Sequence, residues 1–199
     1  MYGRGVREVE VLEDPRAAAL ALDPIKRRIL AALDRPGSAA SLAGQLGLSR
    51  QKINYHLRAL EEQGLVEAAR ERRWGGLTER LMVASAESYV VSPSALGPLA
   101  VDPARTRDRL SASYAIALAS RMVRELGALL RRADAADKRL ATLSVDTVIS
   151  FKSAADRAAF TRDLTSAITA LAARYHDEKE PGARPHRLVV ASYPAPKSD

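Results

Sequence analysis

Cysteine is absent from this 199-residue sequence, and histidine, methionine and aromatic residues are scarce. Without cysteine the chain has no disulfide, no thiolate metal site and no cysteine nucleophile. It also lacks the run of roughly 18 to 20 apolar residues that a membrane span needs, and its start, MYGRGVREVEVLEDP, lacks the apolar stretch of a signal peptide. We therefore expect a cytoplasmic protein with no membrane partner.

Recognisable catalytic motifs are missing too. There is no Gly-rich phosphate loop and no Gly-x-Ser-x-Gly elbow, and only three histidines are present to act as bases. The remaining candidate metal ligands, which lie at a helix end and in the polar loop HDEKEPGARPH, are His176, Asp177, Glu178 and His186. A solvated loop explains this stretch better than a metal site does. We predict that the chain is not an enzyme and holds neither a metal nor another cofactor.

The composition that is present fits a soluble globular protein with a basic surface. Hydrophobic residues make up 47% of the chain, enough for a real core, and the formal net charge is +7. A positive balance favours a polyanionic partner such as nucleic acid. Because the excess of basic residues is larger after residue 90 than before it, the case for DNA depends on where particular side chains lie.

Capping signals predict a series of helices in the first third of the chain. Asp14 before Pro15 and Asp23 before Pro24 each open one, because aspartate caps the first amides and proline suits the first helical position. Ser38 and Ser49 open two more, which end at glycines. Val9 and Val11 alternate with charged residues ahead of these helices and predict a short strand.

A hairpin is predicted after the last of these helices. Strand-like runs flank Trp74-Gly75-Gly76, and paired glycines tolerate the positive φ angles of tight turns. The stretch SYVVSP adds a brief strand, and the proline-rich residues 93–105 form an irregular connector. Three helices followed by a hairpin predict a winged helix-turn-helix, whose second motif helix enters the DNA major groove.

The predicted groove-facing helix runs from Ser49 and presents planar hydrogen-bonding groups between its apolar positions. Arginine can pair with guanine, and asparagine or glutamine with adenine, while Ser49 and nearby amides can hold a phosphate. The alternative is an ordinary solvated face, with His56 in a packing role and the hairpin arginines simply exposed. The predicted DNA-binding residues are Ser49, Arg50, Gln51, Asn54, Tyr55, His56, Arg58, Arg72 and Arg73.

The stretch SLAGQLGLSRQKINYHLRALEEQGLV, together with DPIKRRILAAL, resembles the ArsR-type family of bacterial winged-helix regulators. The resemblance runs from about residue 14 to residue 91. Leu48, Ser49 and Ile53 fall in register with the family's recognition-helix motif, as do the later His56-Leu57 pair and the Gly-Leu-Val that ends it. Asn54 replaces the usual serine, so the family's base preference does not carry over. The resemblance implies a dimeric DNA-binding regulator, more often a repressor.

The second half of the chain predicts a long helix and a small α/β part. Apolar residues at helical spacing mark a helix over about 106–132 and another over about 154–176. Alternating residues predict strands at 140–151 and 186–194. The fold class is therefore α+β. We predict a winged helix-turn-helix domain over 1–92, a connector over 93–105, and a region for dimerisation and effector binding over 106–199.

An apolar effector site is predicted between the long helix and the first of these strands. Its candidate residues are Tyr114, Leu118, Met122, Leu126, Val145, Ile149, Phe151 and Tyr175. An ordinary core and dimer interface explains the same residues equally well.

The sequence thus predicts a cytoplasmic homodimer that binds double-stranded DNA and regulates transcription, with a small apolar effector as a further candidate partner. Two other functions are open at this level. One is a winged helix used for protein contacts, and the other is an enzyme-like domain that binds a small molecule in the C-terminal part. A winged helix used for protein contacts would keep any duplex binding when Arg50 and Asn54 are replaced by alanine, whereas a DNA-binding regulator would lose it. An enzyme-like domain would have a pocket with convergent titratable groups.

Overall fold

The computed structural model describes residues 6–74, 77–177 and 180–196, and the side chains of 71–74, 77 and 78 also fall outside the description. The chain forms two compact units, Met1–Leu140 and Ala141–Asp199. The connector and the long helix therefore belong to the same unit as the winged domain, whereas the sequence analysis grouped the long helix with the C-terminal part.

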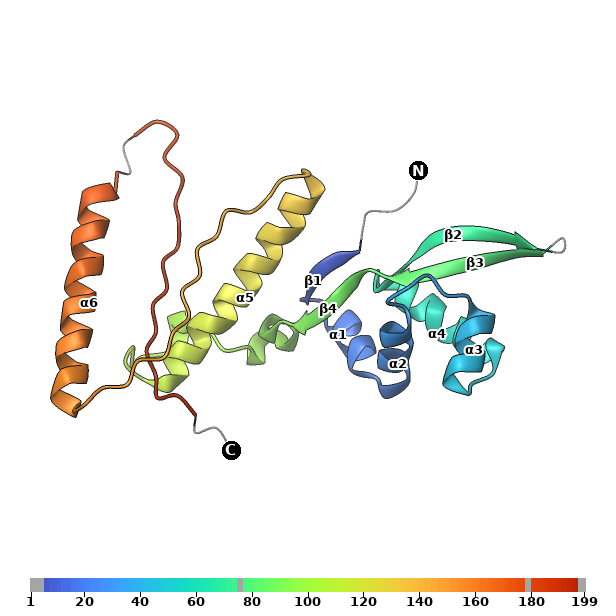
Figure 1. Ribbon diagram of the computed structural model, residues 1–199, viewed down its shortest axis with the longest axis horizontal. Helices are drawn as coiled ribbons and strands as arrows, with labels where there is room; N and C mark the ends of the chain where they lie inside the picture. Colours follow the sequence, from blue (N-terminus) through green and yellow to red (C-terminus); the bar gives the residue numbers. More distant parts are fainter. Residues whose placement is uncertain (1–5, 75–76, 178–179, 197–199) are drawn as a thin grey trace. The chain divides into compact units, whose positions relative to one another are not determined.

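The elements of the first unit follow the predicted order, as Figure 1 shows. Its helices are α1 (Pro15–Leu22), α2 (Pro24–Ala32), α3 (Ala39–Leu46), α4 (Arg50–Glu62) and α5 (Ala112–Ala135), and its strands are β1 (Arg7–Leu12), β2 (Val66–Trp74), β3 (Leu77–Ala84) and β4 (Ala86–Val91). Two short 3-10 helices, η1 (Pro93–Leu99) and η2 (Pro103–Arg105), make up most of the connector.

The predicted caps begin the four N-terminal helices. The Asp14 carboxylate accepts hydrogen bonds from the amides of Arg16 and Ala17, and Asp23 does the same for the next helix. Ser38 forms a reciprocal capping box with Ser41. Each cap satisfies amides that would otherwise lack partners at a helix start, so these short helices begin at defined residues.

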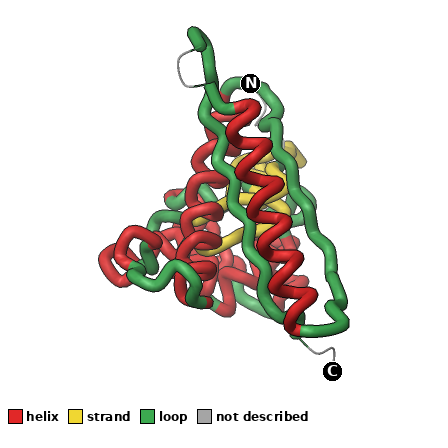
Figure 2. The backbone as a smooth tube through the Cα atoms, turned by 90° about the vertical axis from the view of Figure 1, so that its left-hand side faces the viewer, coloured by secondary structure: helices red, strands yellow, loops and turns green. Residues whose placement is uncertain are grey.

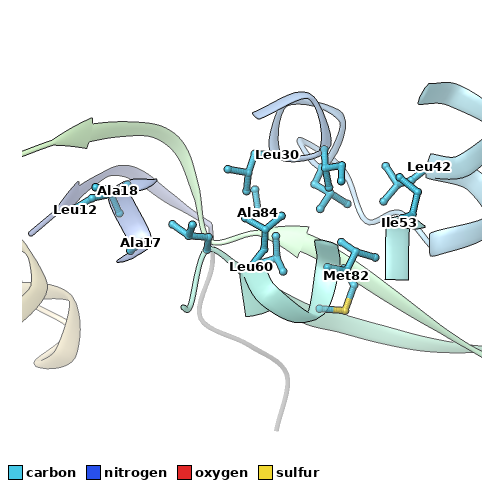
Figure 3. Close-up of a cluster of buried hydrophobic side chains, with 14 residues drawn as sticks. Leu12, Ala17, Ala18, Leu30, Leu42, Ile53, Leu60, Met82 and Ala84 are labelled. Atoms are coloured by element: carbon cyan, nitrogen blue, oxygen red, sulfur yellow. The ribbon is translucent and has the colours of Figure 1, made fainter. Parts of the chain in front are cut away.

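The helix-turn-helix surrounds one hydrophobic core. Ile29, Ile53 and Leu60 are fully buried, and Leu42 and Met82 pack in the same cluster (Figure 3). Contributions come from α2, α3, α4 and the hairpin together. Because these side chains interlock at the packing density of an organic crystal, the core fixes the angle at which α4 is presented.

The hairpin of β2 and β3 is attached to the helices by backbone hydrogen bonds. The strands pair antiparallel, with a register irregularity between Ala68 and Arg70. The amide of Gly37 donates to the carbonyl of Met82 and the amide of Met82 donates back to Gly37, both at 2.8 Å. The turn between α2 and α3 therefore anchors β3. The predicted Gly75-Gly76 turn lies outside the described residues.

A parallel pair of strands links the N-terminus to the end of the wing. β1 pairs with β4, with Arg7 opposite Ala86 and Leu12 opposite Val91. The sequence predicted both strands but not their pairing. Helix α5 packs on β1, where Gly127 lies against Val11, and the Arg131 guanidinium donates to the Val11 carbonyl at 3.1 Å and pairs with Glu13 at 3.2 Å.

Helix α5 begins six residues later than the sequence predicted. Asp108 accepts a hydrogen bond from the Leu110 amide in a turn, and Ser111 then caps the helix by accepting from the Tyr114 amide. These local side-chain bonds compete with helix formation upstream. The predicted start near Thr106 is therefore wrong.

The second unit contains one helix, α6 (Ala154–Tyr175), capped by Ser153. Its flanking segments, at residues 141–151 and 184–196, have no regular secondary structure and form no strand ladder in the part of the chain that the structure describes, and Figure 2 draws them as loops. The two strands predicted at 140–151 and 186–194 are thus not formed within this chain. A strand needs a neighbour for its amides and carbonyls, and the described residues of this unit supply none.

Candidate nucleic-acid interface

Helix α4 has one buried face and one polar exposed face. Ile53, His56, Leu57 and Leu60 face the core, and this spacing of three and four residues is that of a single helix side. Ser49 caps the helix by accepting a hydrogen bond from the Lys52 amide at 3.2 Å. The cap starts the helix at Arg50, so the exposed residues begin in its first turn.

The exposed face brings together the side chains predicted to read bases. A single shallow depression is lined by five of them, Arg50, Gln51, Asn54, Tyr55 and Arg58. Tyr55 is 70% exposed although it is a large aromatic residue. These positions lie on adjacent turns of one helix side, so their donors and acceptors point the same way. The base edges in a DNA major groove offer hydrogen-bond donors and acceptors that are complementary to these side chains.

His56 is the exception among the predicted contacts. Its side chain is only 7% exposed, and its ring lies edge-on to Tyr55 with centroids 5.4 Å apart. The structure thus places it in the packing role that the sequence left open. We correct its assignment as a DNA-contacting residue, because a buried imidazole cannot reach a phosphate without unfolding its surroundings.

The burial of His56 lowers the pKa of its imidazole below the ordinary value of 6.5, and the positive charge of Lys26 lowers the pKa further while Asp23 opposes the shift. Lys52 also faces the ring and adds a small lowering of the pKa. Neither ring nitrogen has a hydrogen-bond partner. The folded protein therefore holds His56 neutral at pH values where the unfolded chain would protonate it.

We expect the free energy of unfolding to decrease as the pH falls from 7.5 to 5. In this window the unfolded chain binds a proton at His56 with a pKa near the ordinary 6.5, whereas the folded pKa is lower, so acidification favours the unfolded state. Urea unfolding at several pH values measures the slope. His56→Leu should flatten it, and an unchanged slope in that variant would contradict the assignment.

Asp23 also has a lowered pKa, but its effect on stability falls at a lower pH than that of His56. Hydrogen bonds from the Lys26 and Ile25 amides, with the Lys26 charge, lower the pKa of its carboxyl below 3.8. Its contribution is complete above that value and is lost only as the pH falls below it. The two residues therefore act in separate pH windows, and the His56 effect can be measured alone.

An ion pair links the wing to α4, and no local pattern in the sequence predicts it. Both Arg80 guanidinium nitrogens donate to Glu61, at 2.5 and 3.0 Å. The pair is largely exposed, so it contributes at most about 1 kcal/mol to stability, but its two-point geometry orients β3 against the end of α4. The residues are 19 positions apart, and only their opposite charges could have indicated the contact.

The predicted wing contacts Arg72 and Arg73 lie in β2, opposite Glu79 and Thr78 of β3. Their side chains fall outside the described residues. The backbone register places them near the distal end of the hairpin, where the sequence predicted a phosphate or minor-groove contact.

A comparison with protein families agrees with the geometry. A family described as a helix-turn-helix domain matches residues 21–68. The match covers α2, α3 and α4 and ends just inside β2. Residues 21–68 form a helix-turn-helix domain. No curated protein matches the chain.

This domain belongs to the winged helix-turn-helix class and indicates a DNA-binding regulator. The matched segment contains all of the exposed α4 residues described above. Most of the wing lies beyond the match and is seen in the structure as β2 and β3.

The predicted effector residues fall in both units and are not assembled into one site by the described contacts. Tyr114, Leu118, Met122 and Leu126 lie on α5 in the first unit, and Met122 is 42% exposed. Val145 and Tyr175, in the second unit, are 83% and 71% exposed. Ile149 and Phe151 belong to the extended segment that was predicted as a strand. Neither the α4 depression nor a second depression near Pro36 and Gly37 is lined by any residue of this set.

Two further properties concern the described residues alone. None of the helices there combines the length and apolar composition of a bilayer crossing. No group of three or more histidine, aspartate or glutamate side chains in the described ranges is placed to hold a metal ion, and Glu178 of the predicted metal candidates lies outside these ranges.

Proposed function

We propose that the chain is a sequence-specific DNA-binding transcriptional regulator of the ArsR type that acts as a homodimeric repressor. The observation that carries the proposal is the shared depression of Arg50, Gln51, Asn54, Tyr55 and Arg58 on α4. Arginine and amide side chains on one exposed helix face can make bidentate contacts to guanine and adenine edges. The core and the Arg80–Glu61 pair hold this face and the wing in fixed positions.

Helix α5 supplies the surface for dimerisation in this proposal. Ile116 is 60% exposed, and Leu129 and Leu130 are also exposed. Large apolar residues on one long helix favour burial against a second helix. A twofold dimer would present two α4 faces to half-sites about one helical turn, or roughly 34 Å, apart.

Regulation by a small apolar effector is a further part of the proposal. If an effector acts, α5 offers the route to the wing, since Arg131 and Gly127 attach it to β1 and β1 pairs with β4. A coupling of about 1–3 kcal/mol would be enough to regulate binding.

Selection of bound duplexes from a random pool with the purified full chain tests the function. We expect enrichment of a palindromic motif with two half-sites. Arg50→Ala should weaken binding to the selected site by about tenfold or more, whereas Arg162→Ala, which removes the same charge from α6, should change it less than about twofold. A pool that shows no enrichment, or equal losses from both variants, would overturn the proposal.

A further inference from the structure

The second unit exposes more apolar surface than a folded unit normally leaves in water. No residue of α6 is buried, and its contact with the preceding segment includes the Phe151 and Phe160 rings, whose centroids are 5.3 Å apart. Large apolar side chains on both extended segments are exposed: Leu143, Val145, Val148, Ile149, Leu188, Val190 and Tyr193. Leu143 is 88% exposed and Val145 83%. Exposure of so many large apolar side chains in one small unit favours an interface.

The segment 141–152 has the pattern of a strand but has no strand beside it. Leu143, Val145, Ile149 and Phe151 alternate with Ser144, Asp146 and Ser150, so an extended backbone puts the apolar set on one face and most of the polar set on the other. In the described residues the two sheets of the protein are β1–β4 and β2–β3 only. The described residues thus supply no neighbouring strand for this segment, and a strand of a second chain could supply one.

The charges of the segment favour a second copy of itself as that strand. In an antiparallel pair centred on Ile149, Asp146 of each copy lies opposite Lys152 of the other, on the same face of the sheet. Opposite charges in directly facing positions stabilise an antiparallel pair, whereas a parallel pair in register would place Asp146 beside Asp146. Thr147 would face Phe151 on the apolar side. A twofold axis at Ile149 makes each favourable contact twice.

We propose that residues 146–152 of two copies pair as antiparallel strands about Ile149, so that the second unit is completed only in the dimer. The inference rests on the homodimer of the proposed function and adds a second, C-terminal interface to the one on α5. The apolar face of the paired strands then becomes a common surface that α6 of each copy can cover, burying the side chains that a single chain leaves exposed.

Disulfide trapping tests this register directly, because the natural chain has no cysteine and each engineered thiol is the only one present. Directly opposed residues in an antiparallel pair have Cα atoms about 4.5–5.5 Å apart, within disulfide range. Ile149→Cys should therefore give a disulfide-linked dimer under a mild oxidant. Thr142→Cys is the matched control, since in this register the two Thr142 positions are about 46 Å apart. We expect cross-linking at 149 to be at least tenfold faster.

Amide hydrogen exchange of the unaltered protein provides a second measurement that no substitution can disturb. Amides within 146–152 should exchange more slowly at concentrations where sedimentation shows a dimer than after dilution to the monomer. The inference would be overturned if the dimer fails to cross-link at position 149. It would also be overturned if the amide exchange rates of the segment are the same in the dimer and in the monomer. Duplex binding is measured separately, so a cross-linked dimer that binds no selected DNA would instead count against the proposed function.

Discussion

Asn54→Ala should lower the affinity for the selected operator by roughly 5- to 150-fold while leaving binding to unrelated duplexes nearly unchanged. Asn54 lies in the α4 depression with Gln51 and the two arginines, and a bidentate amide contact to adenine supplies about 1–3 kcal/mol of discrimination. The substitution should lower the affinity for the operator more than the affinity for unrelated DNA, because most non-specific affinity comes from phosphate contacts. Titration of operator and scrambled duplexes at one fixed salt concentration measures the specific and the non-specific affinity.

A matched pair of glutamines controls for the loss of an amide side chain. Gln51 lies on the α4 face, whereas Gln45 lies on α3 and lines a different depression. Gln51→Ala should relax base preference in the same way as Asn54→Ala, and Gln45→Ala should leave it within about twofold. Equal effects at both glutamines, or equal losses on operator and scrambled DNA for Asn54→Ala, would rule out base reading by this face.

Gly127→Ala should destabilise the protein by about 1–3 kcal/mol, although alanine is usually the better residue inside a helix. A Cβ atom at Gly127 would lie 2.6 Å from the Val11 Cβ atom. That atom is fixed to the backbone of β1, so α5 must shift away from the strand. The shift would also strain the Arg131 bonds to Val11 and Glu13. Urea unfolding of the full chain measures the change.

Gly44→Ala is the corresponding control in α3. An added Cβ atom there meets nothing within 4 Å, so only helix propensity acts and the substitution should stabilise by up to about 1 kcal/mol. In a double-mutant cycle, Val11→Gly combined with Gly127→Ala should cost less stability than the sum of the two single changes, because glycine at position 11 removes the Cβ atom that the new methyl group would meet. A Gly127→Ala protein as stable as Gly44→Ala would show that α5 does not pack on β1 as described.

The parts of the fold that depend on local chemistry could be predicted from the sequence. Asp14, Asp23, Ser38 and Ser49 cap the helices they were predicted to cap, because a cap needs only its own side chain and the next few amides. The helix opened by Ser38 ends at a glycine, as predicted, and this Gly47 has the left-handed conformation that favours glycine, with φ of 67°. Pairings between distant segments, such as β1 with β4, carry no such local signal.

Of the candidate site, helical spacing predicts which α4 residues are exposed, and the same spacing predicts that His56 is buried. Ile53, His56 and Leu60 are separated by three and four positions, which puts the histidine on the buried side. The ion pair between Glu61 and Arg80 depends on tertiary packing and left no periodic signal. The C-terminal strands failed for a different reason, since a strand pattern predicts an extended backbone but does not say whether a partner strand belongs to the same chain.

Dimethyl sulfate protection of a selected operator tests most directly whether α4 reads the major groove. The reagent methylates guanine N7 in the major groove and adenine N3 in the minor groove, and these atoms are distinct contact points for a bound protein. With Arg50 and Arg58 on the exposed face, we expect protection of guanine N7 in two patches one helical turn apart, lost in the Arg50→Ala variant. Protection confined to adenine N3, or none at saturating protein, would contradict the account.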